Sequence, residues 1–131
     1  MNNYSLLTLI TIITLSVTSC YGMITGVVTQ ETFTSGMITL TDLNYAIDQQ
    51  NYTTGGVTFT YPVGWFTQPP LVQVAVIQNV SHPTTETFGA EVSANSTTST
   101  TVMVYQVSSG GTVNEAPASA ITVCLLAVDN P

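Results

Sequence analysis

The chain contains neither lysine nor arginine, so ion pairs with these residues cannot stabilise any fold that it adopts. Its stability has to come from apolar burial and backbone hydrogen bonds. Seven carboxylates give it a formal net charge of −7. Nucleic-acid binding depends on cations that displace counterions from phosphates, and phosphoryl transfer and polybasic lipid binding need Lys or Arg as well. We therefore expect no nucleic-acid partner and no phosphoryl-transfer activity.

The length of 131 residues is typical of one domain, and an apolar content of 44% is enough to build a core. Thr, Val, Tyr, Phe and Ile are abundant, whereas Lys, Arg and Glu, which favour helices, are absent or rare. The composition therefore predicts an all-β domain, and the regular spacing of the strands suggests an antiparallel β-sandwich. The expected strands lie at residues 26–30, 36–40, 57–61, 71–77, 88–94, 101–107 and 121–128.

Two features of these segments can be checked directly. In 71–77 the Val face, formed by Val72, Val74 and Val76, is the better candidate for the core. Residues 41–51 are the least β-like part of the chain, because Asp42 could cap a short helical turn.

The first 22 residues form a hydrophobic leader. No charged residue precedes Glu31, and residues 6–17 have the length of a signal-peptide core, although a basic N-terminal region is missing. Cleavage before Met23 would remove the leader. Three other interpretations stay open: a lipoprotein-like signal ending at Cys20, a retained segment that packs or anchors, and a transmembrane helix, which needs about 20 apolar residues. Contact with a membrane is expected only through this segment, if it is retained.

The two cysteines depend on that choice. If the leader is removed, Cys124 stays alone in an apolar strand as an inert thiol. If it is retained, a bridge between Cys20 and Cys124 becomes possible.

Four segments carry a resemblance to a known family. They are VTFT at 57–60, PPLVQVAV at 69–76, VSANSTTSTTV at 92–102 and ITVCLLAV at 121–128. Their order and spacing resemble those of the H-type lectin domain, over about residues 57–131. The resemblance implies an antiparallel β-sandwich that assembles as a trimer and binds sugars between subunits. On this basis residues 23–56 are N-terminal strands and a loop that precede the lectin-like sandwich.

The chain departs from the family at the positions that hold the sugar. The family's arginine position falls near Gly89 and its aromatic position near Ser109. Neither residue can replace the family's side chain, so the fold transfers better than the activity. Relatives of this domain also occur on viral and phage fibres, where assembly and surface display are sufficient.

Candidate ligand-binding residues follow from the chemistry of sugars, which present an apolar ring face and hydroxyl groups. Tyr61 and Trp65 could supply an aromatic platform, and Asp42 and Asp48 could accept hydrogen bonds. The alternative is that Trp65 closes one end of the sandwich, because a large aromatic residue near a Pro/Gly turn commonly packs.

Catalysis is not expected. His82 has Glu86 four residues away but no evident Ser partner, and Glu86 and Glu91 belong to no recognisable pair of acids. No cluster with metal-ligand spacing is present, so we expect neither a metal nor another cofactor.

Self-association has better support. The chain lacks the lysines that commonly protect exposed sheet edges, and a neighbouring subunit would cover them. The sequence therefore predicts a non-enzymatic surface recognition module that works as a homo-oligomer, outside cells or on a particle surface, with glycans as ligands. The alternative is a structural protein of a virus particle, fibre or extracellular filament that uses the same sandwich for assembly.

Overall fold

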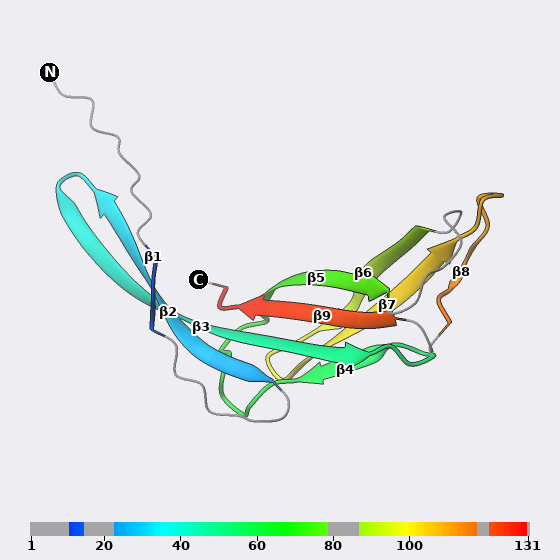
Figure 1. Ribbon diagram of the computed structural model, residues 1–131. Coiled ribbons are helices and arrows are strands. Elements are labelled where there is room, and N and C mark those ends of the chain that lie inside the picture. The colour runs from blue at the N-terminus through cyan, green and yellow to red at the C-terminus, as the bar shows by residue number, and fades with distance from the viewer. Residues whose placement is uncertain (1–10, 15–22, 79–86, 118–120, 131) are drawn as a thin grey trace, which may run out of the picture.

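The computed structural model describes residues 11–14, 23–78, 87–117 and 121–130, and these contain strands and no helix (Figure 1). The strands are β1 (Thr11–Thr14), β2 (Ile24–Thr34), β3 (Met37–Asn51), β4 (Val57–Thr60), β5 (Leu71–Gln78), β6 (Thr87–Asn95), β7 (Ser99–Val107), β8 (Val113–Glu115) and β9 (Ile121–Val128). The prediction of an all-β fold is confirmed.

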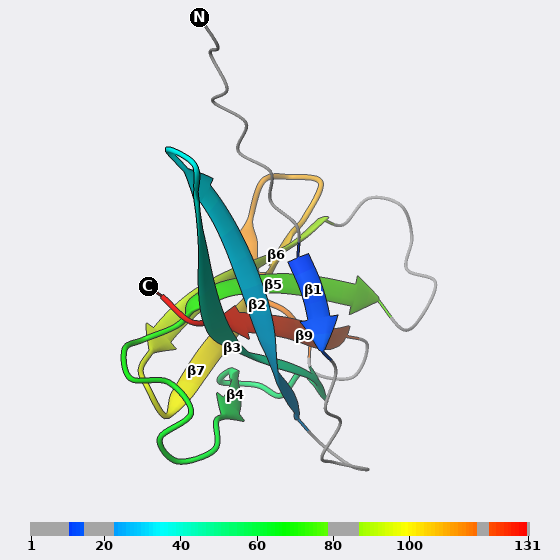
Figure 2. The ribbon, with the colours of Figure 1, turned by 90° about the vertical axis from the view of Figure 1, so that its left-hand side faces the viewer.

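The strands form two antiparallel sheets. The first, called sheet A, has the order β1-β2-β3-β9-β5. The second, sheet B, has the order β4-β7-β6, and β8 also pairs with β7. The two sheets form the layers of a sandwich, in which β5 and β9 of sheet A lie over β6 and β7 of sheet B (Figures 1 and 2).

The core lies between the sheets and follows the alternation of each strand. In β9 every second residue is buried: Ile121, Val123, Leu125 and Ala127. Sheet B contributes Val57, Phe59, Val102 and Val104 from the opposite side. Because the two sets belong to one contiguous cluster, apolar burial stabilises the sandwich.

Most strand predictions agree with the structure. All seven expected strands exist. Six of them end within four residues of the expected positions, whereas β3 continues from the expected end at Leu40 to Asn51. The Val face of β5 packs against the core as predicted. The short strand β8 was not predicted.

The helical turn expected near Asp42 is wrong. Residues 41–51 belong to β3, which pairs with β2 from Met37 to Ile47 and with β9 from Tyr45 to Asn51. At Asp42 the pairing with Thr29 of β2 decides the conformation, and it outweighs the local preference of Asp42 for a cap.

The sandwich begins before residue 57. The segment 23–56 supplies β2 and β3, and β3 lies in sheet A directly beside β9. Residues 23–56 are therefore part of the sandwich and do not precede it. Of the leader, only β1 is described, and it pairs with β2 at the edge of sheet A (Figure 2). Cys20 and the rest of 1–22 lie outside the described residues.

The β2–β3 hairpin projects beyond the sandwich. β3 stops pairing with β9 at Tyr45, so residues 37–44 continue past the end of β9 for about 26 Å at 3.3 Å per residue. Figures 1 and 2 show this hairpin extending away from β5 and β9. Its loop, Ser35 and Gly36, has positive φ angles at both positions (51° and 83°), as in the type I′ turn that suits a two-residue hairpin. We call residues 31–40, which lie beyond both β1 and β9, the arm.

Candidate ligand-binding pocket

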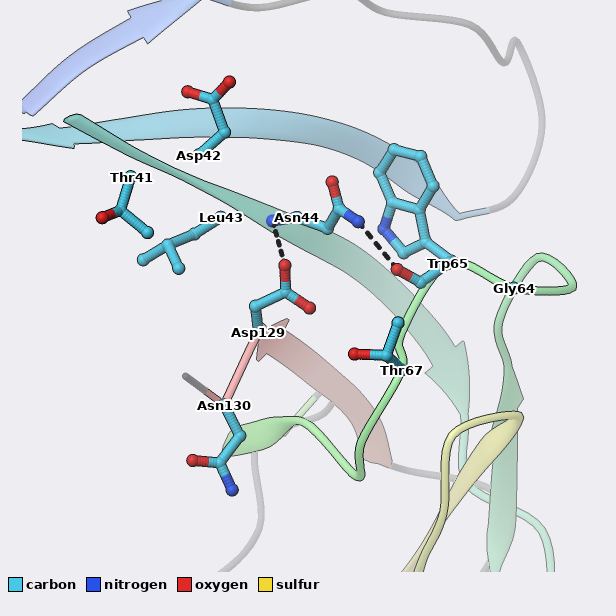
Figure 3. Close-up of a pocket in the computed structure, with 9 residues that line it drawn as sticks. All are labelled: Thr41, Asp42, Leu43, Asn44, Gly64, Trp65, Thr67, Asp129 and Asn130. Carbon is cyan, nitrogen blue, oxygen red and sulfur yellow. Dashed lines mark hydrogen bonds between the residues drawn. The ribbon is translucent and has the colours of Figure 1, made fainter.

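A pocket of about 240 Å³ lies where the projecting hairpin leaves the sandwich (Figure 3). Residues 41–44 of β3 form one wall. Gly64, Trp65 and Thr67, from the loop between β4 and β5, form another, and the C-terminal residues Asp129 and Asn130 complete the lining. The pocket thus joins three segments that are distant in the sequence.

Asn44 holds these segments together. The ladder between β3 and β9 ends at the pair Tyr45–Val128. One residue further, the backbone N–H of Asn44 donates to Asp129 Oδ2 (2.7 Å), and the backbone N–H of Asp129 donates to Asn44 O (2.9 Å). The side-chain Nδ2 of Asn44 donates to the carbonyl oxygen of Trp65 at 2.8 Å (Figure 3). The carboxylate of Asp129 therefore takes the place of a further strand residue and stays at the mouth of the pocket.

Trp65 is fixed by two hydrogen bonds of its own. Its backbone N–H donates to Pro62 O at 3.1 Å, which closes the turn that contains Gly64. Its indole Nε1 donates to Tyr45 O, also at 3.1 Å. The ring is half-buried and packs against the core. The indole thus has a fixed orientation and still borders the pocket.

The pocket is rich in hydrogen-bond acceptors and carries negative charge. Asp42 Oδ1 accepts from the hydroxyl of Thr29 at 2.7 Å, and Asp129 uses Oδ2 for Asn44. The other oxygen of each carboxylate has no hydrogen-bond partner among the described residues. Since the chain has no Lys or Arg, no side chain of these types neutralises the two charges. The arrangement suits a neutral ligand with several hydroxyl donors and disfavours an anion.

The structure brings together two of the four predicted binding residues. Asp42 and Trp65 both line the pocket. Asp48 does not, because it lies further along β3, where its carboxylate accepts from the backbone N–H of Gln49 (2.8 Å) and from Gln50 Nε2 (3.0 Å).

Tyr61 does not line the pocket either. It is 3% exposed and stacks edge-on against Phe66 at a centroid distance of 4.8 Å. Its ring belongs to the core, so it cannot serve as a platform for a ligand from solvent. The alternative expectation for Trp65, that it packs, agrees with its position against the core, beside the buried Phe66.

Sequence reasoning missed Asn44, Thr67, Asp129 and Asn130 as members of this site. One signal was available: the polar pair Asp129-Asn130 directly follows the most regularly alternating strand, so it had to emerge at a sheet end. Of the residues considered for catalysis, Glu91 lies on β6, whereas His82 and Glu86 are outside the described residues. Gly89 also lies on β6, and Ser109 lies in the turn after β7.

The described part of the chain contains no group of three or more His, Cys, Asp or Glu that could hold a metal ion. Within the same residues no helix has the length and apolar character to cross a membrane. Cys124 is a free, half-buried thiol on β9. Comparisons with known proteins find no matching family model, no matching curated sequence and no matching solved structure.

Proposed function

We propose that the protein is a non-catalytic, homo-oligomeric recognition module that binds neutral carbohydrate in the pocket between β3, Trp65 and Asp129. The observation that carries this proposal is the joint presence of an indole held by hydrogen bonds and two carboxylates, each with an oxygen that bonds to no described residue. An aromatic edge or face packs against the C–H groups of a sugar ring, and carboxylates accept from its hydroxyls.

The charge and the volume of the pocket limit the class of ligand that it can bind. Two carboxylates without a cationic neighbour of Lys or Arg type repel acidic sugars, which agrees with a neutral sugar as the ligand. The pocket is smaller than the roughly 300–1,000 Å³ typical of sites for drug-sized ligands, so it suits one sugar ring. Because it is shallow and polar, we expect a Kd on the order of 1 mM for a monosaccharide.

The single tryptophan of the chain provides the test. Neutral monosaccharides are titrated into the full-length protein while the fluorescence of Trp65 is recorded. Asp42→Asn should weaken binding about tenfold, since a hydrogen bond to a charged group contributes about 1.5–3 kcal/mol. Asp48→Asn, the same change on the same strand outside the pocket, should leave binding unaltered. A titration that gives no saturable change, or one that both variants alter equally, refutes the assignment.

In this proposal the sandwich is of the H-type lectin kind and works as a trimer outside cells or on a particle surface. The support is the resemblance of residues 57–131 together with the two antiparallel sheets of the sandwich. A mass measurement of the assembled native protein tests the trimer.

A second function is favoured by the projecting hairpin. A structural protein of a virus particle, fibre or filament needs surfaces that join copies, and the arm carries exposed apolar residues that the sandwich leaves uncovered. Ordered self-assembly without any sugar binding would support this function over the first.

A further inference from the structure

The outer face of sheet A, which points away from the core, carries an apolar strip across four strands. The register places Ile24, Ile47 and Leu126 in one cross-strand row, and Tyr45, Val128 and Leu71 in the next. Ile24, Ile47 and Leu71 are 37%, 43% and 58% exposed, Leu126 and Val128 are half-buried, and Tyr45 is buried at 5% exposed. We call these six residues the strip. Contiguous exposed apolar surface of this kind marks an interaction site more often than an inert surface.

The strip is also free of charge. Side chains alternate between the two faces of a strand, and Leu125 points into the core. By this alternation and the register, Glu31, Asp42 and Asp48 belong to the core side of sheet A. The other described carboxylates lie outside sheet A, on β6, on β8 and after β9. The outer face of sheet B is different, because exposed threonines such as Thr58 and Thr60 alternate with its buried core residues.

The arm is the second uncovered apolar surface. Phe33, Ile38 and Leu40 share its core-side face with Glu31, the cross-strand partner of Leu40, and are 38%, 64% and 62% exposed. No sheet B strand packs under them, because their positions lie beyond the end of β9. Among the described residues, 37–44 of β3 pair with β2 alone, so no described strand covers their other edge. A two-stranded hairpin is marginally stable by itself, and an open edge without Lys or Pro is prone to pairing with another chain.

The arm cannot cover the strip of its own chain. It is the continuation of β2 and β3, which themselves contribute to the strip, and it extends away from β5 and β9 (Figures 1 and 2). The dimensions fit a second copy. The four strands of the strip span about 15–20 Å at 4.8 Å per strand, and the hairpin projects about 26 Å.

We propose that the arm of one copy lies across the strip of a second copy, with Phe33, Ile38 and Leu40 against Ile47 and Leu71. Every chain therefore carries one donor surface and one acceptor surface, and the contact is head to tail. Electrostatics favours this face: two molecules of net charge −7 repel each other, and the strip is where a second copy meets no carboxylate. The inference rests on the proposed self-association and is independent of sugar binding.

The test uses the full-length protein and two pairs of variants. Ile38→Asp places a charge on the apolar face of the arm, and its control, Thr39→Asp, places the same charge on the opposite face of the same strand. Leu71→Asp places a charge on the strip, and its control, Thr60→Asp, places the same charge on the outer face of sheet B. Sedimentation velocity should show that Ile38→Asp and Leu71→Asp are monomers, whereas the two controls assemble like the unaltered protein.

Mixing the two disrupting variants identifies the geometry. An Ile38→Asp copy retains an intact strip and a Leu71→Asp copy retains an intact arm, so an equimolar mixture should form a heterodimer although each variant alone is a monomer. An interface of strip against strip predicts no such rescue and would be unaffected by Ile38→Asp. Far-ultraviolet circular dichroism confirms that each variant is folded.

Three results would overturn the inference. The first is a monomeric unaltered chain at about 100 µM, where an interface with a micromolar Kd would be largely occupied; this would mean that another segment, such as the leader, covers the strip. The second is assembly that survives Ile38→Asp. The third is a mixture that stays monomeric. Trp65 fluorescence titrations of the same variants report the sugar site separately, and Ile38→Asp should not alter them.

Discussion

Tyr45 lies directly across sheet A from Gly26, and its phenol ring fills the space that a side chain at residue 26 would need. A Cβ added there would stand 2.7 Å from Tyr45 Cε1, closer than real Cβ contacts allow. Residue 26 therefore has to be glycine because there is no room for a side chain, and not because its backbone conformation requires glycine. The ring, 5% exposed, in turn shields the backbone of β2 at that point.

Gly26→Ala should destabilise the protein by about 1–3 kcal/mol, the range for overpacking a tightly packed site. The measurement is urea unfolding followed by circular dichroism. Gly89→Ala is the matched control, since it lies in a strand too and a Cβ there meets nothing within 4 Å. It should be neutral or stabilise by about 0.4–1 kcal/mol. Equal effects of the two substitutions would contradict the packing argument.

Tyr45→Phe should stabilise the protein. The hydroxyl of Tyr45 is buried and has no hydrogen-bond partner among the described residues. An unsatisfied buried hydroxyl costs about 1–3 kcal/mol, so its removal should raise the melting temperature. Tyr61→Phe provides the contrast, because the hydroxyl of Tyr61 bonds to Thr100 at 2.5 Å and its loss should lower the melting temperature. A decrease in both variants would show that Tyr45 has a partner in solution.

Thr100→Val should strongly destabilise the protein, although valine has almost the same shape as threonine. Thr100 is fully buried, and its hydroxyl donates to Asn95 Oδ1 at 2.8 Å. Having one proton, it then accepts from the hydroxyl of Tyr61. Valine leaves the buried hydroxyl of Tyr61 without a partner, which costs about 1–3 kcal/mol in chemical unfolding, whereas water can replace the partner of the exposed Asn95.

The control for Thr100 lies next to it on the opposite face of β7. Thr101 bonds to Thr58 at 2.9 Å on the exposed side of sheet B. Thr101→Val should change stability by less than about 0.5 kcal/mol, because water replaces the lost partner. A Thr100→Val protein as stable as the Thr101→Val protein would refute the role of the buried hydroxyl.

The strands that could be predicted are those whose alternation is visible in the sequence. In β9 and β5 apolar residues recur at every second position or faster, so Val72, Val74 and Val76 could be assigned to the core. The part of β3 around Asp42 could not be predicted from the sequence. Asp42 and Asn44 resemble the start of a helix, and only pairing with β2 makes them strand residues. β8 is too short to show any period.

Only some of the pocket residues could be predicted from the sequence, for a similar reason. Residue type alone pointed to Asp42 and Trp65, because sugar chemistry needs acceptors and aromatic rings. The contact that builds the pocket, Asn44 with Asp129, joins positions 85 residues apart. That contact depends on the register of β3 against β9, which no local pattern encodes. Tyr61 and Trp65 also look equivalent in sequence, and the path of one loop decides that only Trp65 borders the pocket.

Glu115 should make part of the stability dependent on acid pH. Its Oε1 accepts from the backbone N–H of Gly55 at 2.5 Å and from the hydroxyl of Tyr52 at 2.8 Å. These two hydrogen bonds, that of Gly55 first, lower the pKa of Glu115 below its ordinary value of 4.5. A carboxyl with a lowered folded-state pKa stabilises the fold fully above its unfolded value and loses that contribution as pH falls through the folded value.

Glu115→Gln removes this titration, so the comparison isolates it from the other carboxylates. The difference in unfolding free energy between the unaltered protein and Glu115→Gln should be constant above about pH 5 and should shrink as the pH falls below 4.5. Urea unfolding at a series of pH values between about 2.5 and 7 measures it. Glu91→Gln, an exposed carboxylate on β6, serves as the matched control. A difference for Glu115→Gln that stays the same at every pH would show that its hydrogen bonds do not favour the ionised form.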